Sequence, residues 1–231
     1  MLTKDILKIT ESIHYNSIFS GADSLQFCHN KEHFKNYKKR ITYRYNSRGF
    51  RDAEWPENLS DSIWCVGDSF TVGIGQPFEE TWPQLLEKKI GKRCINLGED
   101  GCSNDTISLR VKEIYKLYQP KLVIVMWSYF SRRRIDNKNV QFDKNDFGVK
   151  NDIENFGKNF SLCQRLHVNL IHFTIPNVFE DMNYLKEKYP DVKILKKLDY
   201  ARDYYHFDIK TSEYVCDEVI KNINEFDKSS K

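Results

Sequence analysis

Short runs of apolar residues, each closed by turn-forming residues, recur along the chain from about residue 62 onwards. They are Ile63–Gly67, Cys94–Leu97, Leu122–Trp127, Val168–Thr174 and a weaker candidate, Val192–Leu195. Runs that are apolar at every position, rather than at alternate positions, are typical of parallel strands covered on both faces. The pattern therefore predicts a parallel sheet.

Helical spacing appears between these runs. From Asp105 to Tyr118 apolar side chains recur every three or four residues, Ser103 or Asn104 can cap the start, and Pro120 marks the stop. Because strands and helices alternate from about residue 62 to the end, we expect a doubly wound α/β domain. In such sheets the functional site lies beyond the carboxyl ends of the strands.

Two more helices are expected, one short and one at the C-terminus. The first covers Trp82–Leu86, and the second covers Tyr214–Phe226 with Thr211 or Ser212 as its N-cap. Residues 1–61 do not fit the alternation, and we interpret them as an N-terminal extension packed on the domain formed by residues 62–231. That extension holds a predicted amphipathic helix and a turn at Asn46–Gly49; the apolar positions of the helix are Ile6, Leu7, Ile9 and Ile13.

Composition excludes several classes of function. The 231 residues are 40% hydrophobic, which is enough for one sizeable core, and the formal net charge is +3. A nucleic-acid partner is not expected, because nucleic-acid-binding proteins normally carry a larger, clustered excess of basic residues.

The sequence also indicates where the protein is located. It begins with charged residues, and no apolar run approaches the ~20 residues that span a bilayer, so we expect no signal peptide and no membrane span. The six cysteines lack CxxC spacing, which favours reduced thiols in a cytoplasmic protein.

The first candidate for chemistry is Gly67-Asp68-Ser69, directly after the clearest predicted strand. A serine at that corner is lifted to the rim of the sheet, where its own N–H can face an oxyanion. The alternative is an ordinary turn that caps the next helix.

Two further segments follow predicted strand ends. Asp203 and His206 stand three apart before the last helix, where a carboxylate can fix the tautomer of an imidazole that serves as base. The loop Asn96–Asn104 contains glycines that leave backbone N–H groups exposed to a developing negative charge. An ordinary strand-to-helix loop remains the alternative for this segment.

Together these segments resemble the blocks of SGNH (GDSL-type) hydrolases. GDSFTVG at 67–73 resembles the first block, NLGEDGCS at 96–103 the second, and Asp203–His206 the DxxH of the last, while Asn46–Asp52 is similar to the lead-in of many bacterial and phage members. The resemblance covers about residues 45–225. It implies a three-layer αβα fold with a flavodoxin-like parallel sheet, no metal or other cofactor, and esterase, lipase, thioesterase or carbohydrate-deacetylase activity.

The resemblance also implies roles for single residues. Ser69 would be the nucleophile, His206 the base and Asp203 its orienter, and the N–H groups of Ser69 and Gly101 would bind the oxyanion. One block departs from the pattern: the family usually has Gly-x-Asn-Asp after the third strand, and the ungapped match to its oxyanion-binding Asn is Phe130.

A third oxyanion donor is therefore expected from Ser128 or Asn104, whose side chains can donate a hydrogen bond near a strand end. Arg132–Arg134 also follows a strand end. It is either a solvated turn or, through Arg132 above all, a binding site for a carboxylate, phosphate or sulfate of the substrate. His29–His33 matches the HxxEH zinc pattern, but its polar, lysine-rich surroundings favour a solvated surface.

The sequence thus predicts a serine-dependent hydrolase that cleaves a small-molecule or carbohydrate ester, such as an O-acetyl group, through an acyl-enzyme. Two alternatives stay open: a degenerate, non-catalytic SGNH fold that binds a glycan or an acylated ligand, and an acyltransferase. The oligomeric state does not follow from the sequence.

Overall fold

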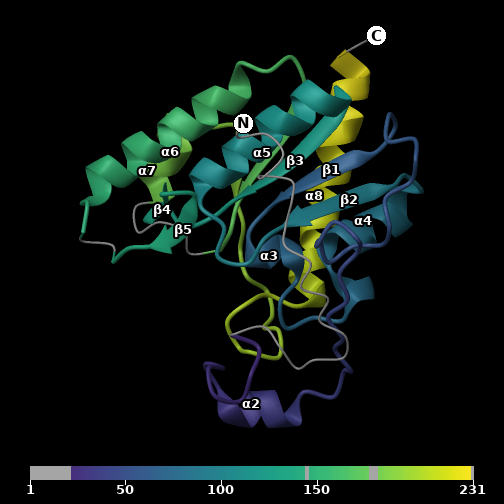
Figure 1. Cartoon of the computed structure of the whole chain (residues 1–231), viewed down its shortest axis with the longest axis vertical. Helices are drawn as coiled ribbons and strands as arrows, with labels where there is room; N and C mark the ends of the chain where they lie inside the picture. The colour runs from purple at the N-terminus through teal and green to yellow at the C-terminus, as the bar shows by residue number, and fades with distance from the viewer. Residues whose placement is uncertain (1–21, 144–145, 177–181, 230–231) are drawn as a thin grey trace.

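The computed structural model describes residues 22–143, 146–176 and 182–229, and its centre is a parallel sheet (Figure 1). The five strands stand in the order β2-β1-β3-β6-β7. Their bounds are β1 Ile63–Gly67, β2 Cys94–Gly98, β3 Leu122–Trp127, β6 Asn169–Thr174 and β7 Val192–Ile194. The winding reverses between β1 and β3, which is the flavodoxin-like order. The predicted doubly wound parallel sheet is confirmed.

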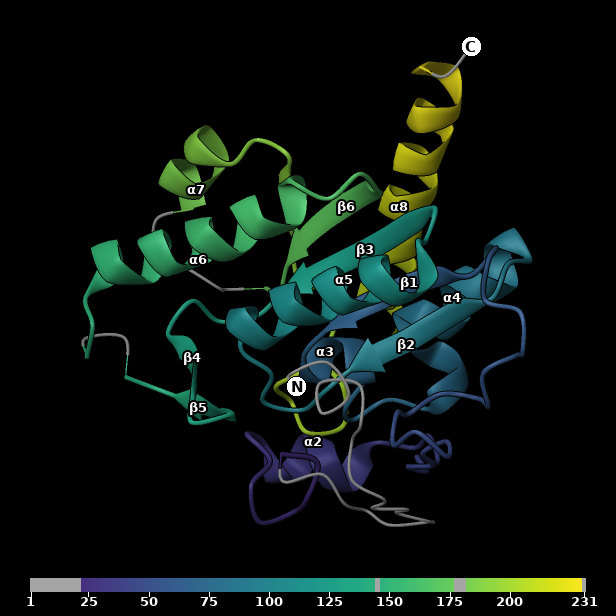
Figure 2. The ribbon, with the colours of Figure 1, turned by 45° about the horizontal axis from the view of Figure 1, so that its top comes forward.

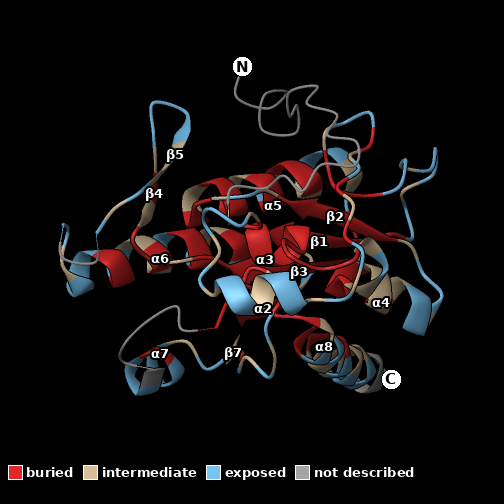
Figure 3. Cartoon of the chain, turned by 90° about the horizontal axis from the view of Figure 1, so that it is seen from below, coloured by how far each residue is buried: buried red, intermediate tan, exposed pale blue. Residues whose placement is uncertain are grey.

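Helices cover both faces of this sheet and give it three layers (Figure 3). On one face α5 (Asn104–Tyr118) lies beside α6 (Val149–Gln164), and on the other α4 (Trp82–Ile90) lies beside α8 (Ile209–Ser229). The strands β1, β2 and β3 are buried at every position. Coverage on both faces explains why these strands are apolar at successive positions.

The remaining helices are shorter. They are α2 (Lys31–Asn36), α3 (Ser69–Val72), the 3-10 turn η1 (Phe78–Glu80) and α7 (Met182–Lys188). An antiparallel hairpin of β4 (Arg132–Ile135) and β5 (Lys138–Gln141) stands apart from the sheet (Figure 2). The solvated turn considered for Arg132–Arg134 is therefore wrong, because these arginines form a strand.

Helix starts were predicted with mixed success. Ser103 caps α5, as one of its two candidates, by accepting a hydrogen bond from the N–H of Thr106. The predicted N-caps of the last helix, Thr211 and Ser212, are wrong because α8 already begins at Ile209. The carboxylate of Asp199 performs the capping instead, since it accepts hydrogen bonds from the N–H groups of Asp208, Lys210 and Thr211 at 2.7 to 3.1 Å.

The described part of the N-terminal segment packs on the sheet domain. The predicted turn at Asn46–Gly49 is present, with the Gly49 N–H 2.9 Å from the Asn46 carbonyl oxygen. Arg51 is fully buried, and its guanidinium donates to backbone carbonyls of Thr42 and of the loop after α3, including Gln76. The amphipathic helix predicted around residues 6–13 lies outside the described residues. Within the described residues, no helix is both long and apolar enough to cross a membrane.

Candidate active site

Ser69 stands at the corner where β1 gives way to α3. Asp68 caps this four-residue helix, because its Oδ1 accepts a hydrogen bond from the Phe70 N–H at 3.1 Å. Ser69 is the first residue of α3, so its N–H belongs to the turn that has no acceptor within the helix. Gly98, at the end of β2, permits this corner to form: a Cβ there would lie 2.4 Å from the backbone nitrogen of Val72.

Ser69, His206 and Asp203 form a continuous chain of hydrogen bonds. The Ser69 Oγ lies 2.8 Å from Nε2 of His206, and Nδ1 of His206 lies 2.5 Å from Oδ2 of Asp203. A proton on Nδ1 satisfies the carboxylate and leaves Nε2 as the acceptor for the serine hydroxyl. This arrangement can withdraw the hydroxyl proton as the serine attacks an electrophile.

The loop before α8 positions Asp203, the acid of this hydrogen-bond chain. Oδ1 of Asp203 accepts hydrogen bonds from the backbone N–H groups of Tyr205 and His206, both at 3.0 Å. Burial alone would raise the pKa of Asp203, but the charge of His206 and these hydrogen bonds outweigh it and hold the pKa below its usual range. Asp203 therefore stays ionised and can stabilise an imidazolium.

The N-terminal segment holds this loop from outside. Nε and Nη2 of Arg202 donate to the two carboxylate oxygens of Asp23 at 2.8 and 2.6 Å. The N–H of His29 donates to the carbonyl of Asp203 at 2.9 Å. In Figure 1 α2 accordingly lies beside the loop that leads into α8. No local sequence pattern indicated these contacts, because their partners are far apart in the chain.

The two histidines of the HxxEH pattern have partners in the same region. The His29 ring stacks on Tyr205 with centroids 4.7 Å apart, and Nε2 of His33 lies 2.9 Å from the carbonyl oxygen of Ala201. Among the described residues no three His, Cys, Asp or Glu side chains gather as metal ligands would. His29 is exposed and His33 is half-buried, as expected for a solvated surface, and both rings also contact the loop before α8.

Gly101 and Asn104 lie beyond the end of β2. Gly101 has φ +70°, in the left-handed region that favours glycine. Asn104 binds the backbone of Ser128 in both directions: its Oδ1 accepts from the Ser128 N–H at 2.8 Å, and its Nδ2 donates to the Ser128 carbonyl at 3.1 Å. The Ser128 hydroxyl donates to Oδ2 of Asp68 at 2.6 Å. Both side chains are thus engaged within the protein, and their service as oxyanion donors stays a prediction, as does that of the Gly101 N–H.

Arg132 enters the site from β4. Its Nη1 donates to Oδ2 of Asp68 at 2.9 Å and to the Ser128 hydroxyl at 2.8 Å. Phe130, at the position of the family's Asn, is buried and stacks on Phe156 with centroids 4.2 Å apart. The sequence suggested Arg132 as a contact for substrate, but not its pairing with Asp68.

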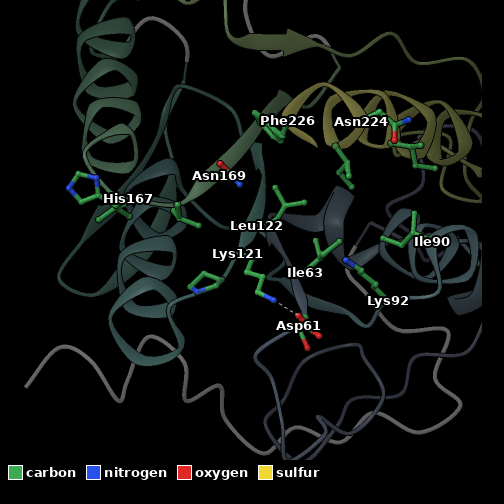
Figure 4. Close-up of a pocket in the computed structure, with 16 residues that line it drawn as sticks. Asp61, Ile63, Ile90, Lys92, Lys121, Leu122, His167, Asn169, Asn224 and Phe226 are labelled. Atoms are coloured by element: carbon green, nitrogen blue, oxygen red, sulfur yellow. Dashed lines mark hydrogen bonds and ion pairs between the residues drawn. The ribbon is translucent and has the colours of Figure 1, made fainter. Parts of the chain in front are cut away.

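A separate cavity of about 870 Å³ lies at the opposite end of the sheet (Figure 4). Its lining includes Ile63, Leu122 and Asn169, which are the first residues of β1, β3 and β6. Lys121 and Asp61 form an exposed ion pair there at 2.6 Å. None of the Ser69–His206–Asp203 chain lines this cavity, so we do not assign the chemistry to it.

No family model and no curated protein matches the sequence. Solved structures do match. A member of the lipolytic protein G-D-S-L family from Veillonella parvula DSM 2008 is 14% identical, with 69% of this chain and 96% of that chain covered and a TM-score of 0.46. The psychrotrophic esterase EstA from Pseudoalteromonas sp., inhibited by monoethylphosphonate, is 18% identical, with 72% and 98% covered and a TM-score of 0.48.

A third match is a carbohydrate esterase whose active site is described as having divergent catalytic and non-catalytic binding functions. It is 14% identical, with 75% of this chain and 67% of that chain covered and a TM-score of 0.49. One of the three is named as a G-D-S-L family protein, and the other two are named as esterases. At 14 to 18% identity these matches do not establish the function of this chain.

Proposed function

We propose that this protein is a serine-dependent ester hydrolase of the SGNH type, acting on a small-molecule or carbohydrate ester. The observation that carries the proposal is the hydrogen-bond chain from Ser69 through His206 to Asp203, with distances of 2.8 and 2.5 Å. A nucleophile bonded to a base, whose other nitrogen is oriented by a carboxylate, is the arrangement that acyl transfer requires.

The reaction would proceed in two halves. The Ser69 Oγ attacks the ester carbonyl carbon while its proton passes to Nε2 of His206, and the oxyanion rests on N–H groups such as those of Ser69 and Gly101. Collapse breaks the bond to the alcohol, which leaves with the proton from His206. A water molecule, deprotonated by His206, then attacks the acyl-enzyme, and the acid departs as Ser69 regains its proton.

A panel of 4-nitrophenyl esters from acetate to palmitate tests this proposal, with wild type beside Ser69→Ala. We expect hydrolysis of at least one ester by wild type and its loss in the variant. A fluorophosphonate probe should also add one phosphonyl group to wild type, located on Ser69 by peptide mass spectrometry. Hydrolysis that continues unchanged in Ser69→Ala would refute the mechanism.

One observation favours a second candidate, a non-catalytic fold that binds a glycan or an acylated ligand. The side chain that replaces the family's oxyanion-binding Asn is Phe130, which packs on Phe156 and has no hydrogen-bond donor. Wild type that neither hydrolyses the panel nor takes up the probe would favour this candidate. An acyltransferase would reveal itself by faster release of 4-nitrophenol when a second hydroxyl compound is added.

A further inference from the structure

A buried carboxylate precedes the nucleophile directly. Asp68 is fully buried, and its Oδ1 caps α3 through the Phe70 N–H. Its Oδ2 accepts hydrogen bonds from the hydroxyl of Ser128 at 2.6 Å and from Nη1 of Arg132 at 2.9 Å. The proposed chemistry of Ser69 therefore takes place next to the Asp68–Arg132 ion pair, which is not part of the Ser69–His206–Asp203 hydrogen-bond chain (the catalytic triad of the proposed function).

Arg132 is held toward this carboxylate from several sides. Its Nη1 also donates to the Ser128 hydroxyl at 2.8 Å, and its Nε donates to Oε1 of Gln141 on β5 at 2.7 Å. The guanidinium lies over the ring of Tyr129, 5.0 Å from the centroid. Its side chain is only 12% exposed. The charge of Arg132 is thus directed into the protein.

An uncompensated negative charge beside a reacting serine opposes acyl transfer. Negative charge develops on the oxyanion next to the Ser69 N–H, and a fixed carboxylate on the preceding residue would repel it. Such repulsion is strong where water is excluded, because the effective dielectric constant is low. An arginine keeps its charge at any pH that proteins tolerate, so it can cancel the carboxylate permanently.

We propose that Arg132 is a positioning residue whose function is to neutralise Asp68 beside the nucleophile, rather than to recognise an anionic group of the substrate. This inference rests on the proposed ester-hydrolase function. It predicts that Arg132 is needed for activity only while Asp68 is charged. Removing both charges should therefore restore the kcat that is lost when Arg132 alone is removed.

The other titratable groups near Asp68 do not supply the positive charge that Arg132 provides. His206 contributes positive charge only when it is protonated, which the base of the reaction must not be in its resting state. Tyr129, Tyr205 and Cys102 also feel the Asp68 charge, but burial raises the pKa of each of them, so they stay neutral. Arg132 is the permanent countercharge among them.

Activity measurements with paired esters test the inference. The 4-nitrophenyl ester of butyric acid and the mono-4-nitrophenyl ester of succinic acid have acyl groups of equal length, and only the second carries a carboxylate. Arg132→Gln should lower kcat about 10²-fold on both esters with little change in KM, a loss comparable to that of an oxyanion donor. Arg132→Lys should lose less, and Lys138→Gln on the same hairpin should behave as wild type.

The double variant gives the decisive comparison. Asp68→Asn combined with Arg132→Gln should recover kcat to within about tenfold of wild type, because contacting residues that act as a pair are not additive. Burial raises the pKa of Asp68 against the opposing effect of Arg132, and loss of Arg132 would raise it further. The ratio of kcat for Arg132→Gln to kcat for wild type should therefore improve on acidification, as Asp68 takes up a proton.

A measurement without turnover separates this inference from the proposed function. In Ser69→Ala protein, Arg132→Gln should lower the urea midpoint of unfolding, because it leaves the buried Asp68 carboxylate without its countercharge. The midpoint should recover when Asp68→Asn is added, because the uncompensated charge is then absent. The same comparison stands even if wild type hydrolyses no ester and takes up no phosphonate.

Three results would overturn the inference. One is a loss confined to the succinic ester and seen mainly in KM, which would make Arg132 a substrate contact. Another is a double variant no more active than Arg132→Gln while thermal unfolding shows it folded. The third is a urea midpoint of Ser69→Ala protein that Arg132→Gln does not lower, or that Asp68→Asn does not restore.

Discussion

Arg202 and Asp23 form a two-point ion pair across 179 positions of the chain, with both carboxylate oxygens of Asp23 accepting hydrogen bonds. Asp23 is fully buried, and the Arg202 side chain is 13% exposed. The pair joins the N-terminal segment to the loop that carries Asp203 and His206. It should therefore affect both the stability of the fold and the geometry of the site.

Arg202→Ala should lower the free energy of unfolding by about 3 kcal/mol, because the buried Asp23 carboxylate then keeps only the hydrogen bond from the Tyr43 hydroxyl and loses its countercharge. Arg202→Lys keeps the charge but loses the two-point geometry, so it should lower kcat about tenfold through a displaced loop. Urea unfolding and 4-nitrophenyl ester kinetics measure the two effects. Lys121→Ala, which breaks the exposed pair with Asp61, is the control and should change neither quantity. Equal kinetics for wild type and Arg202→Lys would show that the loop is positioned without this pair.

The triad variants should not be additive. Ser69→Ala and His206→Ala should each lower kcat by about 10⁴-fold or more, and the double variant should be no slower than either. Asp203→Asn should retain more activity, because Asp203 only orients and stabilises the imidazolium. A harmless Asp203→Asn would mean that the acid of the triad is misassigned.

Ionisation of Asp203 should not limit activity in mild acid. Burial opposes the charge on Asp203, but His206 and the backbone N–H groups outweigh burial and hold the pKa of this carboxyl below its usual range. Asp203 therefore stays ionised between about pH 7 and pH 5, and any fall of kcat/KM in this range should follow one proton and not two. A fall that follows two protons in this range would contradict the assignment.

Asn104→Ala should destabilise the fold as well as the site. It removes the partner of the buried N–H and carbonyl of Ser128 together, and each unsatisfied group costs about 1–3 kcal/mol. Ser108→Ala, which removes a buried hydroxyl on the same helix, is the matched control and should cost less, because Ser108 does not contact the Ser128 backbone. Chemical unfolding checks the stability. A variant as stable as the control would show that solvent replaces Asn104.

Stability should fall in mild acid because of His172. Burial lowers its pKa to about 4, so the unfolded chain takes up a proton between that value and the ordinary pKa of 6.5 while the folded state does not. Neutral, buried His172 makes its full contribution to the free energy of unfolding above pH 6.5, and this contribution is lost as the pH falls toward 4. The pKa difference corresponds to a loss on the order of 3 kcal/mol. Urea unfolding at about pH 7 and pH 4.5 should show a smaller fall for His172→Gln than for wild type. The exposed His167→Gln is the control, and an identical fall in all three proteins would contradict the assignment.

The sequence predicted the parts of the fold that local patterns determine. Strands β1 and β3 were predicted with their exact bounds, because burial on both faces makes them apolar throughout. Helix α6 was not predicted, although its buried positions Ile153, Phe156 and Phe160 follow helical spacing. The start of α8 was misplaced because its cap, Asp199, lies ten residues before the helix and leaves no local signature.

In the candidate site, too, the sequence indicated residues that lie in local motifs but not contacts between distant positions. Ser69, Asp203 and His206 occupy short motifs at predicted strand or helix ends, so the sequence could indicate them. The contact of Arg132 with Asp68 joins positions 64 apart, and that of Arg202 with Asp23 joins positions 179 apart. No periodicity or spacing relates such positions, and only the folded chain brings them together.

The position of His206 just before the last helix has a consequence for synthesis of the protein. Ser69 emerges from the ribosome with the first strand, but His206, the base of the proposed reaction, follows 137 positions later. Contacts of such separation form late, because a long loop must close before they contribute. A nascent chain that has already formed β1, β2 and β3 therefore holds Ser69 without its hydrogen-bond partner His206. Under the proposed function, ester hydrolysis begins only when the C-terminal segment docks, and enzyme activity would serve as a direct assay for completed folding.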